Sequence, residues 1–256
     1  MTPSATHLVL IPSYNTGWRL RVTVQEACAH WLPVWVIVDG STDGSADAMR
    51  ELARHEPGLR VLVQSPNRGK GAAVLAGAEA ALREGFSHAL VMDADGQHPA
   101  DRIGDFMRAS AREPTALVLG RPVFGRDAPP ARMVGRRLSV ALVRWEILGA
   151  GIDDPLFGFR VYPLAPLVRV LHDTRFARRF DFDPEVAVRL FWSGLPTRNL
   201  AAACRYLSCA EGGVSHFHYW RDNLRMVWLH IRLLAELLLW RGISLRRMRR
   251  AALSSS

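Results

Sequence analysis

Short apolar runs alternate with stretches of helical periodicity along the first 120 residues. The apolar runs are rich in Val, Ile and Leu and are too short for helices, so they predict strands. These strands are expected at His7–Pro12, Val34–Asp39, Arg60–Gln64, His88–Asp93 and Thr115–Gly120. Helices are expected between them at Trp18–Trp31, Ser45–Arg54, Gly71–Arg83 and Asp101–Ala111. Such alternation predicts βαβ units and a parallel sheet with helices on both faces.

The second half of the chain is less regular. It predicts helices at Arg132–Leu148, Pro184–Ser193 and Asp222–Trp240, and strands at Phe159–Pro163 and Thr197–Leu207. The expected fold class is α/β, with a Rossmann-like, mostly parallel sheet and an amphipathic C-terminal helix. We expect one domain over residues 1–217, followed by the C-terminal helix and a basic tail over residues 218–256.

Polar residues cluster directly after each of the first four predicted strands. The clusters are PSYN at 12–15, DGSTDGS at 39–45, PNRGKG at 66–71 and DADGQHP at 93–99. Ligands of open parallel sheets bind beyond the carboxyl ends of the strands. Four clusters at one edge therefore predict a ligand site there.

The fourth cluster carries the sharpest candidate chemistry. Asp93 and Asp95 point to the same side of an extended segment, where their charges repel unless a cation lies between them. Hard carboxylate oxygens favour Mg²⁺ or Mn²⁺ shared with substrate phosphates, and Gln97 and His98 could complete or orient the site. The alternative is a solvated turn that caps the following helix.

Two further clusters suggest nucleotide binding. The glycines around Lys70 would let the backbone approach an anion at a helix N-terminus, although the spacing is not that of a P-loop. Asp39 could accept from a base or ribose. A tight turn and a capped turn, respectively, remain the alternatives. No G-x-G-x-x-G follows the first strand, which argues against a nicotinamide enzyme.

Composition adds two observations. The net charge is +9, and of the 33 basic residues only Lys70 is a lysine. Biased codon usage explains many arginines, but a lone lysine at a predicted anion site also suits a role for an ammonium group. The chain has three cysteines and no C-x-x-C pair, so neither a disulfide framework nor a zinc site is expected.

The positive charge is concentrated near the C-terminus. Residues 217–256 contain eight arginines and two acidic residues, which gives +6 of the total of +9. An apolar helix with tryptophans and a basic flank suits an anionic membrane interface. The alternatives are a helix packed on the domain or in a homodimer. No nucleic-acid motif accompanies the arginines, so no nucleic-acid partner is expected. Neither a signal peptide nor a membrane span is apparent, and we expect a cytoplasmic protein at the inner face of the membrane.

In order, the motifs IPSYN, DGSTDGS, NRGKGAAVLAG, MDADGQHP, DPLFGFRVY and FDFDPE resemble family 2 glycosyltransferases of the GT-A fold, closest to the dolichyl-phosphate mannosyltransferase-like branch. The resemblance covers residues 7–217. It implies a nucleotide site, a diphosphate and metal site, and an acidic residue near the acceptor. The matching positions are Pro12, Tyr14, Asn15, Asp39, Asn67 and Lys70 for the nucleotide, Asp93, Asp95 and Gln97 for the metal and diphosphate, Asp154 and Glu185 for the acids, and Arg205 and Ser215 for phosphates.

This sequence departs from the family pattern at three places. Val38 replaces the first Asp of D-D-G-S, Thr16 replaces a Glu after Tyr-Asn, and His216 replaces a Lys after the late G-x-S. The first two changes affect the expected contacts with the base. The third exchanges a fixed charge for a titratable one.

The implied reaction is sugar transfer with inversion. A hydroxyl acceptor needs a general base, for which Asp154 is the first candidate and Glu185 the second. A phosphate acceptor is already anionic and needs none; Arg121, Arg132 or Arg136 would then position it. Structural alternatives exist for both acids, because Asp154 could cap a turn before Pro155 and Glu185 could pair with Arg189 on its helix.

The leading hypothesis is therefore a metal-dependent, inverting glycosyltransferase that uses a UDP- or GDP-sugar and a lipid-linked acceptor. One alternative is a sugar-nucleotide nucleotidyltransferase, which also uses glycine-rich and acidic loops. The other is a membrane-associated protein that binds a nucleotide-sugar without turnover.

Overall fold

In the computed structural model, which describes residues 2–125, 130–205 and 219–254 except for the side chains of 130–132, 219–221 and 240–254, seven strands form one sheet. Their order is β3-β2-β1-β4-β6-β5-β7. The strands are β1 (His7–Ser13), β2 (Val34–Asp39), β3 (Leu59–Gln64), β4 (His88–Val91), β5 (Leu117–Phe124), β6 (Arg160–Pro163) and β7 (Thr197–Cys204). Only β6 runs against its neighbours in this sheet, since it pairs antiparallel with both β4 and β5.

Both faces of the sheet are buried, as β1 illustrates. Leu8 and Leu10 belong to one apolar cluster, whereas Val9 and Ile11 belong to the other. Side chains of a strand alternate between faces, so an unbroken apolar run gives a strand that is covered on both sides. The core thus has two layers, one on each side of the sheet.

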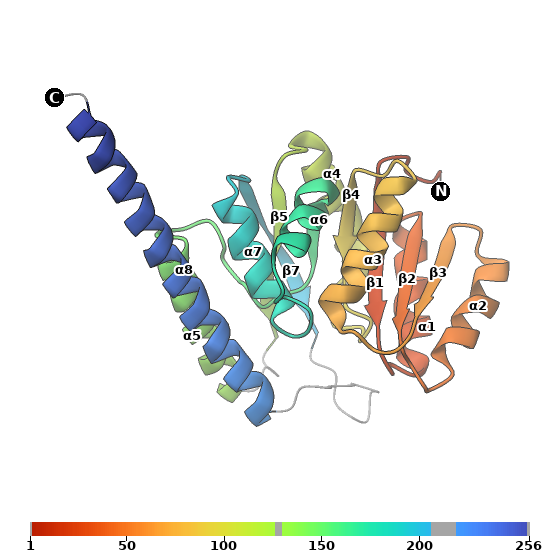
Figure 1. Ribbon diagram of the computed structural model, residues 1–256. Coiled ribbons are helices and arrows are strands. Elements are labelled where there is room, and N and C mark those ends of the chain that lie inside the picture. Colours follow the sequence, from red (N-terminus) through yellow and green to blue (C-terminus); the bar gives the residue numbers. More distant parts are fainter. Residues whose placement is uncertain (1, 126–129, 206–218, 255–256) are drawn as a thin grey trace.

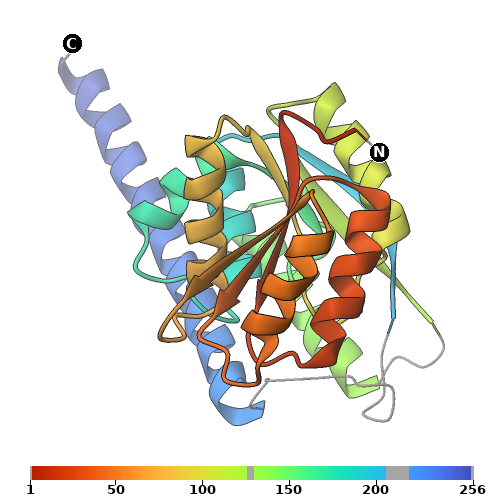
Figure 2. The same ribbon diagram turned by 90° about the vertical axis from the view of Figure 1, so that its right-hand side faces the viewer.

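The helices form these two layers (Figures 1 and 2). The helices are α1 (Trp18–His30), α2 (Ser45–His55), α3 (Lys70–Arg83), η1 (Ala100–Arg102), α4 (Ile103–Arg112), α5 (Pro130–Glu146), α6 (Leu164–Asp173), α7 (Phe182–Trp192) and α8 (Tyr219–Ser254). Side chains of α1, α2 and α4 join the cluster that contains Val9, and those of α3 and α5–α8 join the cluster that contains Leu8.

The predicted α/β, mostly parallel fold is confirmed, and each predicted strand and helix is present. Their ends lie within a few residues of the predicted ones except in α8, which we expected to end at Trp240 and which continues to Ser254. One helix was missed. In α6 the buried residues Leu164, Leu167 and Leu171 follow helical spacing, but Pro166 obscures the pattern. Proline is tolerated there because the first turn of a helix has no internal N–H partner to lose. Among the residues described, no helix is long and apolar enough to cross a membrane.

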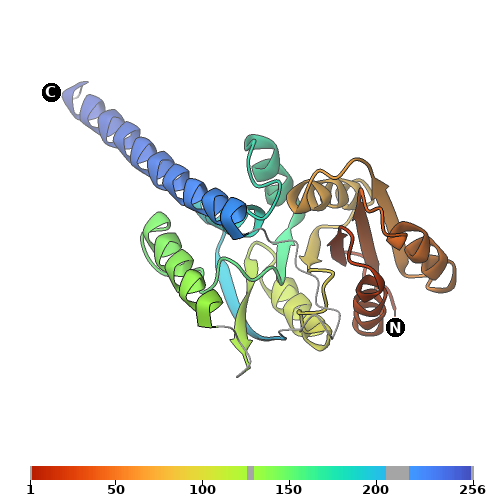
Figure 3. The same ribbon diagram turned by 90° about the horizontal axis from the view of Figure 1, so that it is seen from below.

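The C-terminal helix α8 packs on the domain through its N-terminal half. Leu229 and Leu233 are buried in the same cluster as Val143 of α5 and Ile147, which directly follows α5. Figures 1 and 3 show the C-terminal half of α8 extending away from the domain. The boundary that we predicted after residue 217 falls within 206–218, outside the described residues, and the division into two parts stays a prediction.

The packing of α8 leads to a stability prediction with an internal control. Leu233→Ala should lower the free energy of unfolding by about 2–5 kcal/mol, because it leaves a cavity in the core. Leu238→Ala, at a position that is 70% exposed, should change it by less than about 0.5 kcal/mol. Chemical denaturation measures both. Equal effects of the two substitutions would contradict the packing described here.

Candidate active site

A lysine held between two carboxylates forms the centre of the site. Nζ of Lys70 lies 2.7 Å from Oδ1 of Asp93 and 2.6 Å from Oδ2 of Asp183. Lys70 begins α3, Asp93 follows β4, and Asp183 lies in the first turn of α7. Burial by itself would lower the pKa of Lys70, but the two carboxylates outweigh it and raise this pKa. The ammonium is therefore charged, and it joins three distant segments at the carboxyl edge of the sheet.

Gly158 closes one side of this cluster. A Cβ atom at Gly158 would lie 2.7 Å from Nζ of Lys70 and 3.1 Å from Oδ2 of Asp93, so no larger residue fits without displacing the charged groups. The side chain of Arg160 fixes the segment. Its Nε donates to the carbonyl of Phe157 (2.8 Å) and its Nη1 donates to the carbonyl of Asp183 (2.5 Å).

Asp183, Gly158 and Arg160 were not among the predicted site residues. The motifs FDFDPE and DPLFGFRVY contained them, but nothing in the sequence indicated that Asp183 meets Lys70. In addition, Oδ1 of Asp183 is buried without a hydrogen-bond partner among the described residues. A buried acceptor oxygen without a donor, next to a lysine, is typical of a site that binds a further ligand.

The second aspartate of the D-x-D motif has an unusual environment. Burial, and then the charge of Asp93, raises the pKa of Asp95 to about 6. Burial alone would raise the pKa of Asp93 too, but the neighbouring ammonium of Lys70 outweighs it and lowers this pKa. One oxygen of Asp95 accepts from the backbone N–H of Gln97 at 3.0 Å. The negative charge of Asp93 thus disfavours ionisation of Asp95, and a cation bound between the two carboxylates would relieve this repulsion.

His98 orients the first aspartate. Its Nδ1 accepts from the backbone N–H of Asp93 at 2.9 Å, and burial lowers the pKa of His98 to about 4, so the ring is neutral. With Nδ1 as the acceptor, Nε2 carries the proton and faces Oδ2 of Asp93 at 3.6 Å.

The donor set around the D-x-D motif fits a divalent ion of the Mg²⁺ type. Within the described part of the chain, three or more His, Cys, Asp or Glu side chains do not come together at any place, this site included, in a way that could hold a metal ion. A site with two carboxylates, Asp93 and Asp95, leaves the other positions to water and substrate phosphates, which is how proteins commonly bind Mg²⁺. Gln97 contributes its backbone to the turn, and its carbonyl accepts from the N–H of Arg205 at 3.1 Å.

The Asp39 carboxylate organises the glycine-rich loop that precedes Lys70. It accepts from the backbone N–H groups of Arg68 (2.9 Å) and Gly69 (2.6 Å) and from Nε2 of Gln64 (2.7 Å). The side-chain amide of Asn67 donates to the backbone carbonyl of Asp39 at 3.0 Å. Asp39 is only 2% exposed, so the structure places it beneath the loop, with its oxygens engaged by protein donors.

The loops after β1 and β2 are joined to each other. Oδ1 of Asn15 accepts from the N–H of Thr42 at 2.7 Å, and its backbone N–H donates to Oγ of Ser41 at 3.0 Å. Pro12 is buried within β1, whereas the side chain of Tyr14 is 38% exposed beside this junction. Of the predicted nucleotide residues in this loop, Tyr14 is thus the most accessible.

Both candidate bases make the structural contacts that we considered as alternatives. One oxygen of Asp154 accepts from the N–H groups of Leu156 (2.8 Å) and Phe157 (2.9 Å), and the other pairs with Arg136 at 2.5 Å. The carboxylate of Glu185 is completely buried and pairs with Arg189 and with Arg232 of α8, at 2.9 and 2.6 Å.

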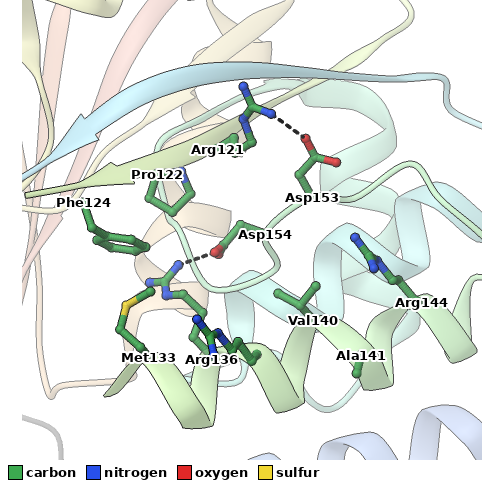
Figure 4. A pocket seen from close by; sticks show the side chains of 11 residues that line it. Arg121, Pro122, Phe124, Met133, Arg136, Val140, Ala141, Arg144, Asp153 and Asp154 are labelled. Carbon is green, nitrogen blue, oxygen red and sulfur yellow. Dashed lines mark hydrogen bonds and ion pairs between the residues drawn. The ribbon is translucent and has the colours of Figure 1, made fainter. Parts of the chain in front are cut away.

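An open pocket of about 330 Å³ lies between β5, α5 and the 153–154 segment (Figure 4). The predicted residues Arg121 and Arg136 both line it, and so do Arg137 and Arg144, which the sequence did not single out. Nη1 of Arg121 lies 4.0 Å from Oδ2 of Asp153. The backbone of Arg132 lies in α5, but its side chain and the whole of Ser215 lie outside the described residues.

Known proteins resemble this chain in sequence and in structure. The model of the family "Glycosyl transferase family 2" matches residues 8–176. Polyprenol monophosphomannose synthase of Mycolicibacterium smegmatis is 34% identical over 62% of this chain and 62% of its own length. Dolichyl-phosphate beta-glucosyltransferase ALG5C of Trichomonas vaginalis is 29% identical over 70% of this chain and 58% of its own length. The match thus spans about three fifths of either relative.

The structural likeness concerns the fold. A crystal structure of glucosyl-3-phosphoglycerate synthase from Mycobacterium tuberculosis, in complex with Mn²⁺, UDP-glucose and phosphoglyceric acid, superposes with a TM-score of 0.61. It is 18% identical, and the superposition covers 93% of this chain and 80% of that one. With the family match, this confirms the GT-A fold and the resemblance to the dolichyl-phosphate glycosyltransferase-like branch. The chain therefore belongs to glycosyl transferase family 2.

Proposed function

We propose that the protein transfers a sugar, with inversion, from a nucleotide-diphospho-sugar to a lipid-linked phosphate, with the help of Mg²⁺ or Mn²⁺. The observation that carries the proposal is that Asp154 and Glu185 are both engaged in ion pairs, while an open arginine pocket adjoins Asp154. A phosphate nucleophile is already anionic and needs no base. The polyprenol and dolichyl-phosphate names of the relatives support the same class of acceptor.

On the donor side, the bond between the anomeric carbon and the diphosphate breaks, and negative charge grows on the diphosphate. When bound to Asp93 and Asp95, a divalent ion supplies positive charge to that leaving group. Lys70 adds a fixed ammonium that Asp93 and Asp183 orient before the substrate arrives. Such preorganised charge stabilises the transition state more than the ground state.

On the acceptor side, an oxygen of the phosphate forms the new bond to the anomeric carbon from the face opposite the leaving group. Arg136 is held by Asp154, and Arg121 lies on the opposite wall of the pocket. Guanidinium groups bind phosphate oxygens in pairs and can fix their orientation. Asp154 is thus a positioning residue in this proposal, and no proton has to leave the nucleophile.

The acceptor's lipid tail implies work at a membrane, and α8 offers a surface for it. Its outward residues are apolar and more than half exposed: Leu224, Val227, Trp228, Ile231, Leu238 and Leu239. They form one uncharged face opposite the buried Leu229 and Leu233. We assign this face to an anionic membrane surface on the cytoplasmic side. The alternative occupant is a second copy of the chain.

Lys70 provides a test of the donor site. Lys70→Ala should weaken the binding of the cognate UDP- or GDP-sugar by about tenfold or more, since the diphosphate would face two unpaired carboxylates. Arg68→Ala removes the same charge from an exposed side chain of the same loop and should bind normally. Calorimetry measures both. Normal affinity of Lys70→Ala for the nucleotide-sugar would refute a role of Lys70 in donor binding.

The metal role has its own test. With a panel of UDP- and GDP-sugars and Mn²⁺, Asp95→Ala should reduce transfer by about a hundredfold or more, because the diphosphate loses its counter-ion. Asp101→Ala removes an exposed carboxylate near the same loop and should retain activity. Chelation of the metal should mimic Asp95→Ala in the wild type. Full activity of Asp95→Ala would refute metal binding by this motif.

The identity of the acceptor can be tested at Asp154. Asp154→Asn keeps a side-chain oxygen that can accept from the N–H groups of the turn, so the rate of transfer to a polyprenyl phosphate should fall by less than about tenfold. Loss of a general base would lower the rate by about 10²–10⁴-fold. Arg136→Gln should raise the KM for the acceptor with little change in the KM for the donor. Steady-state kinetics with each substrate varied in turn measures this. A loss of kcat by more than a hundredfold in Asp154→Asn would instead identify Asp154 as the base.

A further inference from the structure

A second arginine-rich pocket lies apart from the residues assigned above. It has a volume of about 220 Å³ and is formed by the loop between α6 and α7 and by one side of α8. In Figure 1 this loop lies below α6, toward the lower end of the sheet, and the first turns of α8 lie below the loop. One acidic residue lines the pocket, Asp181. Five arginines line it as well: Arg175, Arg178, Arg179, Arg225 and Arg232.

Three of these arginines have no carboxylate partner among the residues that the structure describes. Within the described part of the chain, the Arg178 side chain donates to the backbone carbonyls of Leu171 and Thr174, and Arg179 donates to the amide oxygen of Asn67. Arg175 forms no ion pair with any residue in the described part of the chain. The carboxylate of Asp181 is itself occupied by backbone N–H groups of the loop. The loop therefore carries an excess of positive charge toward α8.

Two guanidinium nitrogens of the arginines that line the pocket lack acceptors in the described structure, although Glu185 and Glu236 bind the other nitrogens of Arg232. Nη1 of Arg178 and Nε of Arg232 are buried without a hydrogen-bond partner among the described residues. The Arg232 side chain is only 10% exposed, and its guanidinium stacks on the ring of Phe176 at 3.7 Å. Buried donors without acceptors are costly, so their presence points to a ligand that supplies oxygens. A phosphate group provides such oxygens in the geometry that guanidinium groups prefer.

The surroundings of the pocket identify the source of the phosphate. Trp228 lines the pocket and is 57% exposed, on the uncharged outer face of α8. Phe176 and Phe180 on the loop are also exposed. Aromatic side chains between an apolar surface and arginines match the interface between acyl chains and phosphates of a bilayer. A soluble anion would leave these apolar side chains in water.

We propose that this pocket binds the phosphate headgroup of an anionic membrane phospholipid while the outer face of α8 contacts the acyl chains. The inference rests on the proposed membrane binding of α8 and adds a specific headgroup site to it. The site also adjoins the catalytic loop: the carbonyl of Arg178 accepts from the N–H of Gly71 at 3.0 Å, next to Lys70. A bound headgroup would therefore hold in place the loop on which the donor site is built.

The test is sedimentation of the full chain with vesicles of phosphatidylcholine, with or without phosphatidylglycerol. Arg175→Gln/Arg179→Gln removes two exposed arginines of the loop, and Arg21→Gln/Arg112→Gln removes two exposed arginines of α1 and α4, on the other face of the sheet. The loop variant should partition onto phosphatidylglycerol vesicles on the order of tenfold less than the wild type, and the control should match the wild type. Thermal unfolding confirms that both variants fold.

Two further arms separate the possible failures. Leu224→Gln/Leu238→Gln alters the outer face of α8 and should abolish sedimentation; a wild type that does not sediment, or that forms a dimer through this face, would refute membrane binding by α8 itself. Equal losses in the loop variant and its control would reduce the effect to net charge and overturn the headgroup site. So would displacement of the wild type by glycerol phosphate at matched ionic strength, which would indicate a site for a soluble anion.

Discussion

The contacts of the Lys70 ammonium with Asp93 and Asp183 join the two halves of the chain at the site. The lysine and Asp93 come from the regular βαβ half, and Asp183 comes from the less regular half. The carboxylate of Asp183 is buried and that of Asp93 is partly buried, and carboxylates removed from water are unfavourable unless a cation compensates them. The position of α7, the absence of a side chain at Gly158 and the path of the glycine-rich loop all serve this one contact. A single fixed charge thus sets where a diphosphate can lie.

A second buried ion pair relates α8 to this centre. Glu185 lies two residues after Asp183 on α7, and both its oxygens are bound by Arg232 of α8, with Arg189 as a further partner. The helix with the exposed apolar face is therefore anchored to the helix that positions Asp183. The surface assigned to the membrane and the residues assigned to the donor are thus connected through the Arg232–Glu185 ion pair. Such an arrangement suits an enzyme whose acceptor is held in a bilayer.

Two carboxylates of the predicted site, Asp39 and Asp154, bind groups of the protein itself. Asp39 binds the backbone of the glycine-rich loop, and Asp154 binds its own turn and Arg136. A carboxylate has several acceptor positions and, once buried, needs donors for all of them. The sequence placed these residues at the correct edge of the sheet. It could not tell whether the donors would come from a ligand or from neighbouring backbone N–H groups.

Local pattern determined most of the fold. Apolar runs buried on both faces gave the strands, and helical periodicity gave all the helices except α6, so the α/β class and the site edge at residues 12–15, 39–45, 66–71 and 93–99 followed from the sequence. Lys70 was recognisable from its loop. Its partner Asp183 was not recognisable, because Asp183 is 113 residues away and an ion pair between distant residues produces no periodic pattern in the sequence. The reversed strand β6, the burial of Glu185 against α8 and the arginine pockets were likewise decided by tertiary packing, since only the folded chain brings those charges within bonding distance.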